Sequence, residues 1–257
     1  MGGPVKSADG TLPSQSHTSV VEQPPIKPVK VLMMHGHGSC GTRLDYKTRH
    51  LQSLIRDAIH KRTKQTVEFL FPNAPLLPTG FGEDTFTWGL GDYRVSRVPG
   101  LEKSIAFLIS YLEEHGPFDG IIGSSAGVCV AVALASLLES PDRCPEFSVK
   151  TSHPRLRFVM AYSGCIMENP CYASLYTPKI ETPTMFFVGE LDSFIPGALT
   201  MRLAECCSNS EVVTFWGAHY IPRFHETNKA AVNFICSTLT EGRENEEDVD
   251  ANAWVDI

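Results

Sequence analysis

Ser125 lies in a five-residue pattern that is typical of a nucleophile held at a sharp turn. Gly123 and Gly127 stand two residues to either side of it, in the order G-x-S-x-G. Tiny residues are needed there because a strand turns abruptly into a helix and presents the serine at the turn. An apolar run at 120–122 precedes the pattern, and a helix-compatible apolar stretch follows it. We therefore interpret Ser125 as a candidate nucleophile, with a glycine-serine turn that does no chemistry as the alternative.

A serine hydroxyl becomes a good nucleophile only when a base removes its proton, and an acid must orient that base. One chain order for such a triad is serine, then aspartate or glutamate, then histidine. Asp192 and His219 follow the apolar runs 183–188 and 211–216, each in a loop that contains a glycine. The sequence therefore predicts a catalytic triad of Ser125, Asp192 and His219.

Each partner of the serine has one rival in the sequence. Glu190 precedes Asp192 in the same loop and is the alternative acid, although its position nearer the strand favours a role in supporting the turn. His225 is the alternative base, but it falls within the pattern of the last predicted helix rather than in a loop. Both alternatives stay open at this point.

An acyl-transfer site also needs two backbone N–H donors that converge on the oxyanion of the tetrahedral intermediate. One comes from the residue after the nucleophile and one from a loop after an early strand, which assigns Ala126 and His37. His35 and His37 also have the H-x-H spacing of two metal ligands, but no further D-H pair or carboxylate cluster completes a metal site. We expect no metal and no organic cofactor.

The candidate residues must be positioned by regular elements, and apolar runs of strand length alternate with helical patterns along the chain. We predict strands at 29–34, 67–71, 120–122, 157–163, 183–188 and 211–216, and helices from 51 to 62, at 101–112, directly after Ser125, and through 231–235. This alternation predicts the α/β class, with a mostly parallel sheet and helices on both faces. Every candidate catalytic residue falls at the carboxyl end of a strand, where such sheets gather their functional groups.

Two irregular segments are predicted to line a substrate pocket. The first, between Pro75 and Pro99, holds several aromatic residues among glycines and prolines, and a structureless stretch of this length is usually functional. The second runs from 167 to 176. The candidate pocket residues are Phe81, Trp88, Met167 and Tyr172. The alternative is that these aromatic side chains only cover the edge of the sheet.

The composition predicts one globular domain. The chain has 257 residues, of which 42% are hydrophobic and 20% charged. We place the α/β domain at 29–239, between a flexible N-terminal tail at 1–28 and an acidic C-terminal tail at 240–257. The net charge of −7 argues against nucleic acid or an anionic membrane as a partner.

Nothing in the sequence predicts secretion or a membrane span. The first 28 residues contain no apolar signal-peptide core, and the chain has no uninterrupted run of 18 apolar residues. The eight cysteines are dispersed without a C-x-x-C pair, which indicates reduced thiols. We therefore expect a cytoplasmic protein.

With these residues identified, the chain resembles the small fungal serine hydrolase (FSH) family of α/β-hydrolases over about residues 29 to 239. The motifs are M-H-G-H-G-S-C-G at 34–41, G-P-F-D-G-I-I-G-S-S-A-G at 116–127, V-G-E-L-D at 188–192 and G-A-H-Y-I-P-R at 217–223. By position, the catalytic residues of the family fall on Ser125, Asp192 and His219. The chain departs from the family at Ser124, where an aromatic residue is frequent, at Ala126, where glutamine is frequent, and at Ala218, where a glycine is frequent. These small replacements leave the shape of the substrate open.

The resemblance implies an α/β-hydrolase fold and cleavage of an ester or acyl thioester through an acyl-serine intermediate. Several members accompany fungal polyketide pathways, where they release or trim an acyl product, so the implied partner is a small acyl ester or thioester, either free or bound to a carrier protein. A general small-ester carboxylesterase, a lyase or cyclase that uses the same triad, and a catalytically silent binding protein are the alternatives. The presence of all three triad residues disfavours the silent protein. The oligomeric state stays open.

Overall fold

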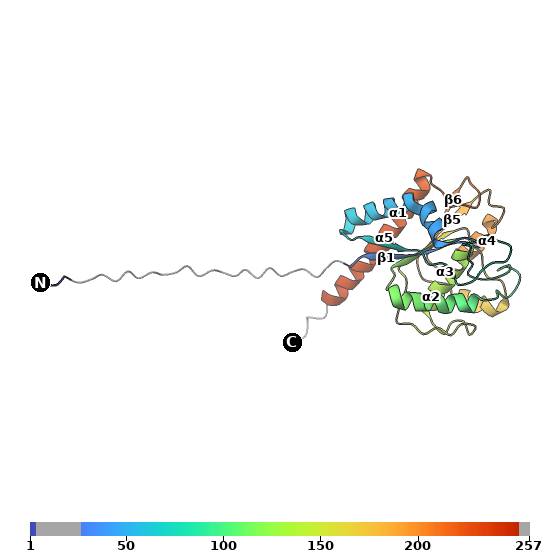
Figure 1. Cartoon of the computed structure of the whole chain (residues 1–257), viewed down its shortest axis with the longest axis horizontal. Coiled ribbons are helices and arrows are strands. Elements are labelled where there is room, and N and C mark those ends of the chain that lie inside the picture. The colour runs from blue at the N-terminus through green and yellow to red at the C-terminus, as the bar shows by residue number, and fades with distance from the viewer. Residues whose placement is uncertain (4–26, 252–257) are drawn as a thin grey trace.

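A computed structural model describes residues 1–3 and 27–251 of the chain. Residues 4–26 and 252–257 lie outside the described part and are drawn in grey in Figure 1. Most of the predicted N-terminal tail falls in the first of these ranges, so that prediction is outside the described residues. From residue 241 onward, only the backbone of the last helix is described.

One six-stranded sheet forms the centre of the domain, in the order β2-β1-β3-β4-β5-β6. The strands are β1 Val29–Met34, β2 Val67–Leu70, β3 Gly120–Ser124, β4 Phe158–Tyr162, β5 Thr184–Gly189 and β6 Ser210–Phe215. All neighbouring strands pair in parallel. The six predicted strands are therefore confirmed, and their carboxyl ends all meet at one edge of the sheet.

Helices cover both faces of this sheet, as the sequence predicted. They are α1 Gly41–Thr63, α2 Leu101–His115, α3 Ala126–Glu139, α4 Gly197–Ala204 and α5 His225–Ala251, with a short 3-10 helix, η1, at Pro170–Tyr176. Figure 1 shows α1 and α5 together on one side of the sheet and α2 and α3 on the other. Alternate side chains of β4 enter the two cores, because successive residues of a strand point to opposite faces.

Two helices are longer than predicted. Helix α1 begins at Gly41 rather than at 51. The prediction missed its first turns because they bury few large apolar side chains and therefore show no apolar period. The residue that precedes it, Cys40, makes no side-chain capping hydrogen bond, so the start has no sequence signal either. The backbone of α5 continues to Ala251, into the range that we assigned to an acidic tail.

The long segment between β2 and α2 is tied to the rest of the domain by few regular contacts. Isolated bridges join Ser39 to Phe86 and Leu76 to Thr87. The Phe86 N–H donates to the Ser39 carbonyl at 2.8 Å, and the Thr87 N–H donates to the Leu76 carbonyl at 2.9 Å. The first bond holds the segment beside the loop that follows β1, at the edge where the strands end, and the second joins two parts of the segment itself.

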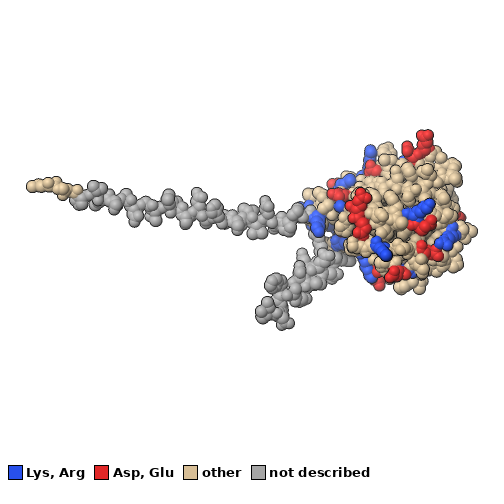
Figure 2. Space-filling view, turned by 60° about the horizontal axis from the view of Figure 1, so that its bottom comes forward, with Lys and Arg blue, Asp and Glu red and all other residues tan. Residues whose placement is uncertain are grey.

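Acidic and basic side chains are interspersed on the face of the molecule that Figure 2 presents. A basic patch of the kind that binds nucleic acid would gather Lys and Arg side chains in one area. The described part of the face in Figure 2 shows no such area, because acidic side chains lie between the basic ones. Within residues 27–251, no helix combines the length and the apolar character that crossing a bilayer requires.

Candidate active site

Ser125 occupies the turn between β3 and α3 in a backbone conformation that non-glycine residues rarely adopt. Its φ is 57° and its ψ is −125°. The Ser125 N–H donates to the Tyr162 carbonyl at 2.9 Å, and the Ser125 carbonyl accepts from the Val128 N–H at 2.8 Å. A conformation of this kind costs of order 1–3 kcal/mol and persists only where the surroundings impose it, as they do at functional turns.

The two flanking glycines are required by close backbone contacts. A Cβ added at Gly127 would lie 2.5 Å from the Met34 carbonyl oxygen and 2.7 Å from that of His35. A Cβ at Gly123 would meet the backbone of Gly127 at 3.0 Å. These contacts place α3 directly against the end of β1, so the strand-turn-helix arrangement predicted from G-x-S-x-G is present.

Asp192 and His219 are hydrogen-bonded to each other. The His219 Nδ1 donates to Asp192 Oδ2 at 2.7 Å, and the other carboxylate oxygen accepts from the N–H groups of Phe194 at 3.0 Å and Ile195 at 2.9 Å. The Asp192 side chain is 1% exposed. Burial alone would raise the pKa of Asp192, but hydrogen bonds from Ile195, His219 and Ser163 together hold this pKa below its ordinary value. Asp192 is therefore an anion that orients the imidazole.

Neither rival takes part in this pair. Glu190 is exposed, and its only backbone tie here is an N–H that donates to the Phe215 carbonyl at 3.0 Å. His225 is exposed at the first position of α5. The structure therefore places Asp192, and not Glu190, beside His219, and it leaves His225 on the surface.

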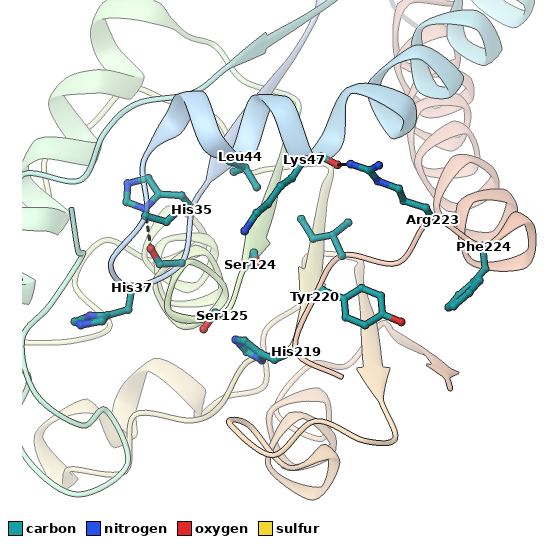
Figure 3. Close-up of a pocket in the computed structure, with 13 residues that line it drawn as sticks. His35, His37, Leu44, Lys47, Ser124, Ser125, His219, Tyr220, Arg223 and Phe224 are labelled. Carbon is teal, nitrogen blue, oxygen red and sulfur yellow. Dashed lines mark hydrogen bonds between the residues drawn. The ribbon is translucent and has the colours of Figure 1, made fainter. Parts of the chain in front are cut away.

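Ser125 and His219 line the same two cavities, so the structure also brings the serine and the histidine of the predicted triad together. Figure 3 shows the His219 ring beside the Ser125 side chain, at the carboxyl edge of the sheet. An imidazole in this place is oriented by Asp192 through Nδ1 and presents its other nitrogen for proton transfer.

The two predicted oxyanion donors are backbone N–H groups without an acceptor among the residues that the structure describes. Ala126 is the first residue of α3, where the helix leaves its N–H groups unpaired, and His37 is in the loop that follows β1. His37 lines both cavities beside Ser125, and Ala126 lines one of them. Both N–H groups are thus available to a developing oxyanion.

The rings of His35 and His37 are occupied by the protein itself. The His35 Nε2 accepts from the Ala74 N–H at 3.0 Å, so its Nδ1 donates to the Gly36 carbonyl at 2.8 Å. The His37 Nδ1 is 2.7 Å from the Thr87 hydroxyl. Burial lowers the pKa of both imidazoles, which keeps them neutral near pH 7. In the described ranges, no three His, Cys, Asp or Glu side chains are grouped to hold a metal ion.

Two cavities meet at the candidate nucleophile. One has a volume of about 580 Å³ and lies between α1 and the loop that follows β6. The other has a volume of about 480 Å³ and lies between the 71–100 segment, α3 and the loops that follow β4 and β5. We call them the α1 cavity and the α3 cavity. They share His37, Ser125 and His219, so a substrate bound at the serine can extend into both.

The comparison with protein families agrees with this geometry. Residues 24–231 match the family described as Serine hydrolase (FSH1). The chain belongs to this serine hydrolase family. The resemblance drawn from the four motifs is therefore confirmed, over nearly the whole of the ordered domain.

Relatives of this serine hydrolase occur in fungi and animals. An uncharacterized hydrolase of Schizosaccharomyces pombe is 27% identical over 80% of the chain, which spans only 50% of that protein. An esterase of Drosophila pseudoobscura is 24% identical over 89% of the chain and 80% of that protein. The crystal structure of Zea mays acyl-protein thioesterase 2 is similar with a TM-score of 0.55 and 16% identity, and covers 83% of the chain and 97% of its own. This last likeness confirms the α/β-hydrolase fold.

Only one of the four predicted pocket residues of this serine hydrolase lines a cavity at Ser125. Phe81 lines the α3 cavity. Trp88 is fully buried in the core, where its Nε1 donates to the His35 carbonyl at 2.8 Å. Met167 and Tyr172 are also buried, and the Tyr172 hydroxyl accepts from the Val98 N–H at 3.1 Å. These three residues line neither of the two cavities at Ser125, because they are buried and hold the irregular segments against the core.

Other residues replace them in the two cavities. The α3 cavity includes Tyr93, which belongs to the irregular segment predicted to line a pocket, and four residues that the sequence analysis did not assign to the pocket, namely Cys129, Cys165, Phe194 and Ile195. The α1 cavity adds Leu44, Lys47, Tyr220, Ile221, Arg223 and Phe224. Phe194 and Ile195 stand two and three residues after Asp192, and Tyr220 follows His219, so nearness to a triad residue was the one signal that could have found them. Lys47 had no such signal, because only the packing of α1 brings it to the site.

Proposed function

We propose that this chain is an esterase or acyl thioesterase that works through an acyl intermediate on Ser125. The observation that supports this most is the 2.7 Å hydrogen bond from His219 to the buried Asp192, beside a serine held at positive φ. A protein that only bound a ligand would have no need for a strained serine and an oriented imidazole in one place.

The proposed reaction has two halves, acylation of Ser125 and hydrolysis of the acyl-serine, and His219 and the two N–H groups serve in both. His219 Nε2 takes the proton of the Ser125 hydroxyl while Oγ attacks the carbonyl carbon of the substrate. The carbonyl oxygen becomes an oxyanion that accepts from the N–H groups of His37 and Ala126. His219 then gives its proton to the departing alcohol or thiol, which leaves an acyl-Ser125 ester. A water molecule repeats the sequence, and the acid product departs with Ser125 restored.

The acyl group of the substrate fits the α3 cavity best. This cavity holds Ala126, one of the two proposed oxyanion donors, and its remaining lining is mostly apolar, with Phe81, Phe194 and Ile195 among the side chains. Its one arginine, Arg94, is neutralised by Asp92 at 2.8 Å. Apolar chains are stabilised by about 0.8 kcal/mol for each methylene that leaves water.

A narrower proposal concerns the biological substrate. The family resemblance supports an acyl product of polyketide secondary metabolism, released or trimmed from a thioester that is free or bound to a carrier protein. A small-ester carboxylesterase is the alternative to this narrower proposal. The two differ in the length of acyl chain that the α3 cavity prefers.

The first experiment labels the protein with a fluorophosphonate probe. Wild-type protein should be labelled at Ser125, whereas Ser125→Ala should not, and Ser124→Ala should serve as the matched control with labelling retained. Labelling of Ser125→Ala at wild-type level would place the nucleophile elsewhere.

The second experiment measures kcat/KM on acyl thioesters of increasing chain length. Each methylene buried in the transition state should raise kcat/KM by about fourfold, until the cavity is filled. If acetyl esters are the best substrates of the wild-type protein, the large-acyl proposal is wrong and the small-ester carboxylesterase replaces it.

A further inference from the structure

Two basic side chains from distant parts of the sequence line the α1 cavity. Lys47 comes from α1, and Arg223 comes from the loop between β6 and α5. The Arg223 Nη2 donates to the Lys47 carbonyl at 3.2 Å, which fixes the guanidinium beside this turn of α1. Figure 3 shows the Lys47 side chain extending from α1 towards Ser124 and Ser125. Both cations therefore line the cavity on the α1 side of the candidate nucleophile, with Lys47 reaching closer to Ser124 and Ser125 than Arg223 does.

No acidic residue neutralises this pair within the described part of the chain. None of the ion pairs there includes Lys47 or Arg223, and the lining of the α1 cavity contains no aspartate or glutamate. The chain as a whole has 29 acidic and 22 basic residues. Two neighbouring basic residues without an acidic partner are therefore unusual for a chain of this composition. The α3 cavity is different, because Asp92 pairs with Arg94 there.

The α1 cavity is the space that the proposed reaction leaves for the departing group, because we assign the acyl group to the α3 cavity. The loop that carries His219 also supplies Tyr220, Ile221, Arg223 and Phe224 to this cavity. In acyl transfer the histidine hands its proton to the departing atom, and His219 lines the α1 cavity, so a departing group in this cavity lies beside its proton donor. The acyl group extends the other way, into the α3 cavity, where Ala126 lies.

We propose that the α1 cavity binds an anionic group, a phosphate or a carboxylate, on the leaving group of the substrate, and that Lys47 and Arg223 recognise it. This inference rests on the proposed acyl-transfer function. Arginine and lysine both form charge-assisted hydrogen bonds with such oxyanions, and an anion would supply the negative charge that this cavity lacks. Lys47 and Arg223 are therefore residues that determine specificity for the departing alcohol or thiol.

The test compares substrates that share an acyl group and differ in the charge of the leaving group. Hexanoyl coenzyme A is paired with hexanoyl N-acetylcysteamine, which has the same reacting thioester without phosphates. The hexanoyl ester of glycolate is paired with that of glycolamide, which lacks the carboxylate. The quantity measured is the selectivity ratio, kcat/KM for the anionic substrate divided by kcat/KM for its neutral partner.

Lys47→Met should lower the selectivity ratio by about tenfold, since Lys47 is exposed and its charge is partly screened by water. Lys47→Glu should lower it further, and the ratio of the wild type should fall as salt is added. Lys61→Met is the matched control, because Lys61 is an exposed lysine near the end of the same helix and lines neither cavity. A fall in the coenzyme A pair alone identifies a phosphate, and a fall in the glycolate pair alone identifies a carboxylate. Equal ratios in wild type and Lys47→Met for both pairs would overturn the proposal.

A binding measurement separates this proposal from the failure of the enzyme function itself. Calorimetry of coenzyme A and of glycolate with the unreacted protein needs no turnover. Wild-type protein should bind at least one of them about tenfold more tightly than Lys47→Met does. If the fluorophosphonate does not label Ser125 but this difference is found, the anion site stands and the proposed reaction fails. If Ser125 is labelled and both proteins bind both probes equally, the reaction stands and the anion site fails.

Discussion

Replacing Asp192 by asparagine should reverse the tautomer of His219. The Asp192 Oδ1 accepts from two backbone N–H groups, those of Phe194 and Ile195, in partly buried hydrogen bonds. An asparagine must keep its amide oxygen against these donors, so its NH2 group faces His219 Nδ1. That nitrogen then has to accept, and the ring proton moves to Nε2, the atom that should receive the proton of Ser125.

The size of the effect follows from the same contacts. Turning the amide round would leave the two N–H groups facing another donor, at about 1–3 kcal/mol for each unsatisfied group. The productive orientation of the side chain is therefore disfavoured by about 2–6 kcal/mol. The loss of the carboxylate also removes its stabilisation of the imidazolium. Together we expect kcat/KM to fall by about three to four orders of magnitude, or about 4–5.5 kcal/mol in the activation barrier.

The assay is steady-state hydrolysis of a hexanoyl thioester by Asp192→Asn, with Glu190→Gln as the control two residues away. Glu190 is exposed and does not contact His219, so its variant should stay within about threefold of wild type. A loss of less than about tenfold in Asp192→Asn, or equal losses in both variants, would refute the tautomer argument.

The same variant tests the pKa of Asp192 through stability. Because this pKa is held below its ordinary value of 3.8 in the folded protein, the carboxylate stabilises the fold above that pH. The contribution is lost as the pH falls through the folded-state value. Denaturant unfolding should therefore show a free-energy difference between wild type and Asp192→Asn that shrinks once the pH is below 3.8. A difference that stays constant into this acid range would contradict the lowered pKa.

Three further outcomes follow from the site and its support. His219→Ala should lower kcat by about three orders of magnitude or more, whereas His225→Ala should leave it unchanged, and the reverse order would reassign the base. Gly127→Ala should lower the free energy of unfolding by about 3 kcal/mol, because its Cβ meets rigid backbone oxygens, whereas Gly82→Ala, which meets no atom within 4 Å, should have little effect in the same denaturation assay. Trp88→Phe should lower the free energy of unfolding by about 1–3 kcal/mol, because the hydrogen bond to the His35 carbonyl is lost. The same variant should leave the dependence of kcat/KM on acyl length unchanged. A weaker dependence on acyl length would show that Trp88 contacts the acyl group.

Most strands were predictable because they are short, mainly apolar runs that end at a glycine, a proline or a polar loop. A strand that is buried on both faces, such as β4, needs no polar residues at alternate positions. Its continuous run of apolar residues therefore identifies it in the sequence. The start of α1 was not predictable, because Leu44 is the one large apolar side chain that the helix buries before Leu51, which is too little to show a period. Tertiary packing against the sheet sets that boundary.

The positions of the triad residues could be predicted from the sequence, whereas the lining of the two cavities could not. Each triad residue follows a strand, and parallel strands bring their ends together whatever lies between them in the sequence. Trp88 and Phe81 lie in one irregular segment, yet one is buried in the core and the other lines the α3 cavity. Without a period, the sequence contains no information about which way each of these side chains points. Lys47 enters the site only because of the way α1 crosses the sheet.

The two cavities share only His37, Ser125 and His219, and this separation has a consequence for how the enzyme can change. The α1 cavity is built from α1 and the loop after β6, whereas the α3 cavity is built from the 71–100 segment and the loops after β4 and β5. A substitution in one wall can alter selectivity for one half of a substrate without moving the other wall. If the two cavities hold the two halves of the substrate as we propose, acyl and leaving-group preferences can diverge independently among descendants of one such gene, as long as the three shared residues stay fixed.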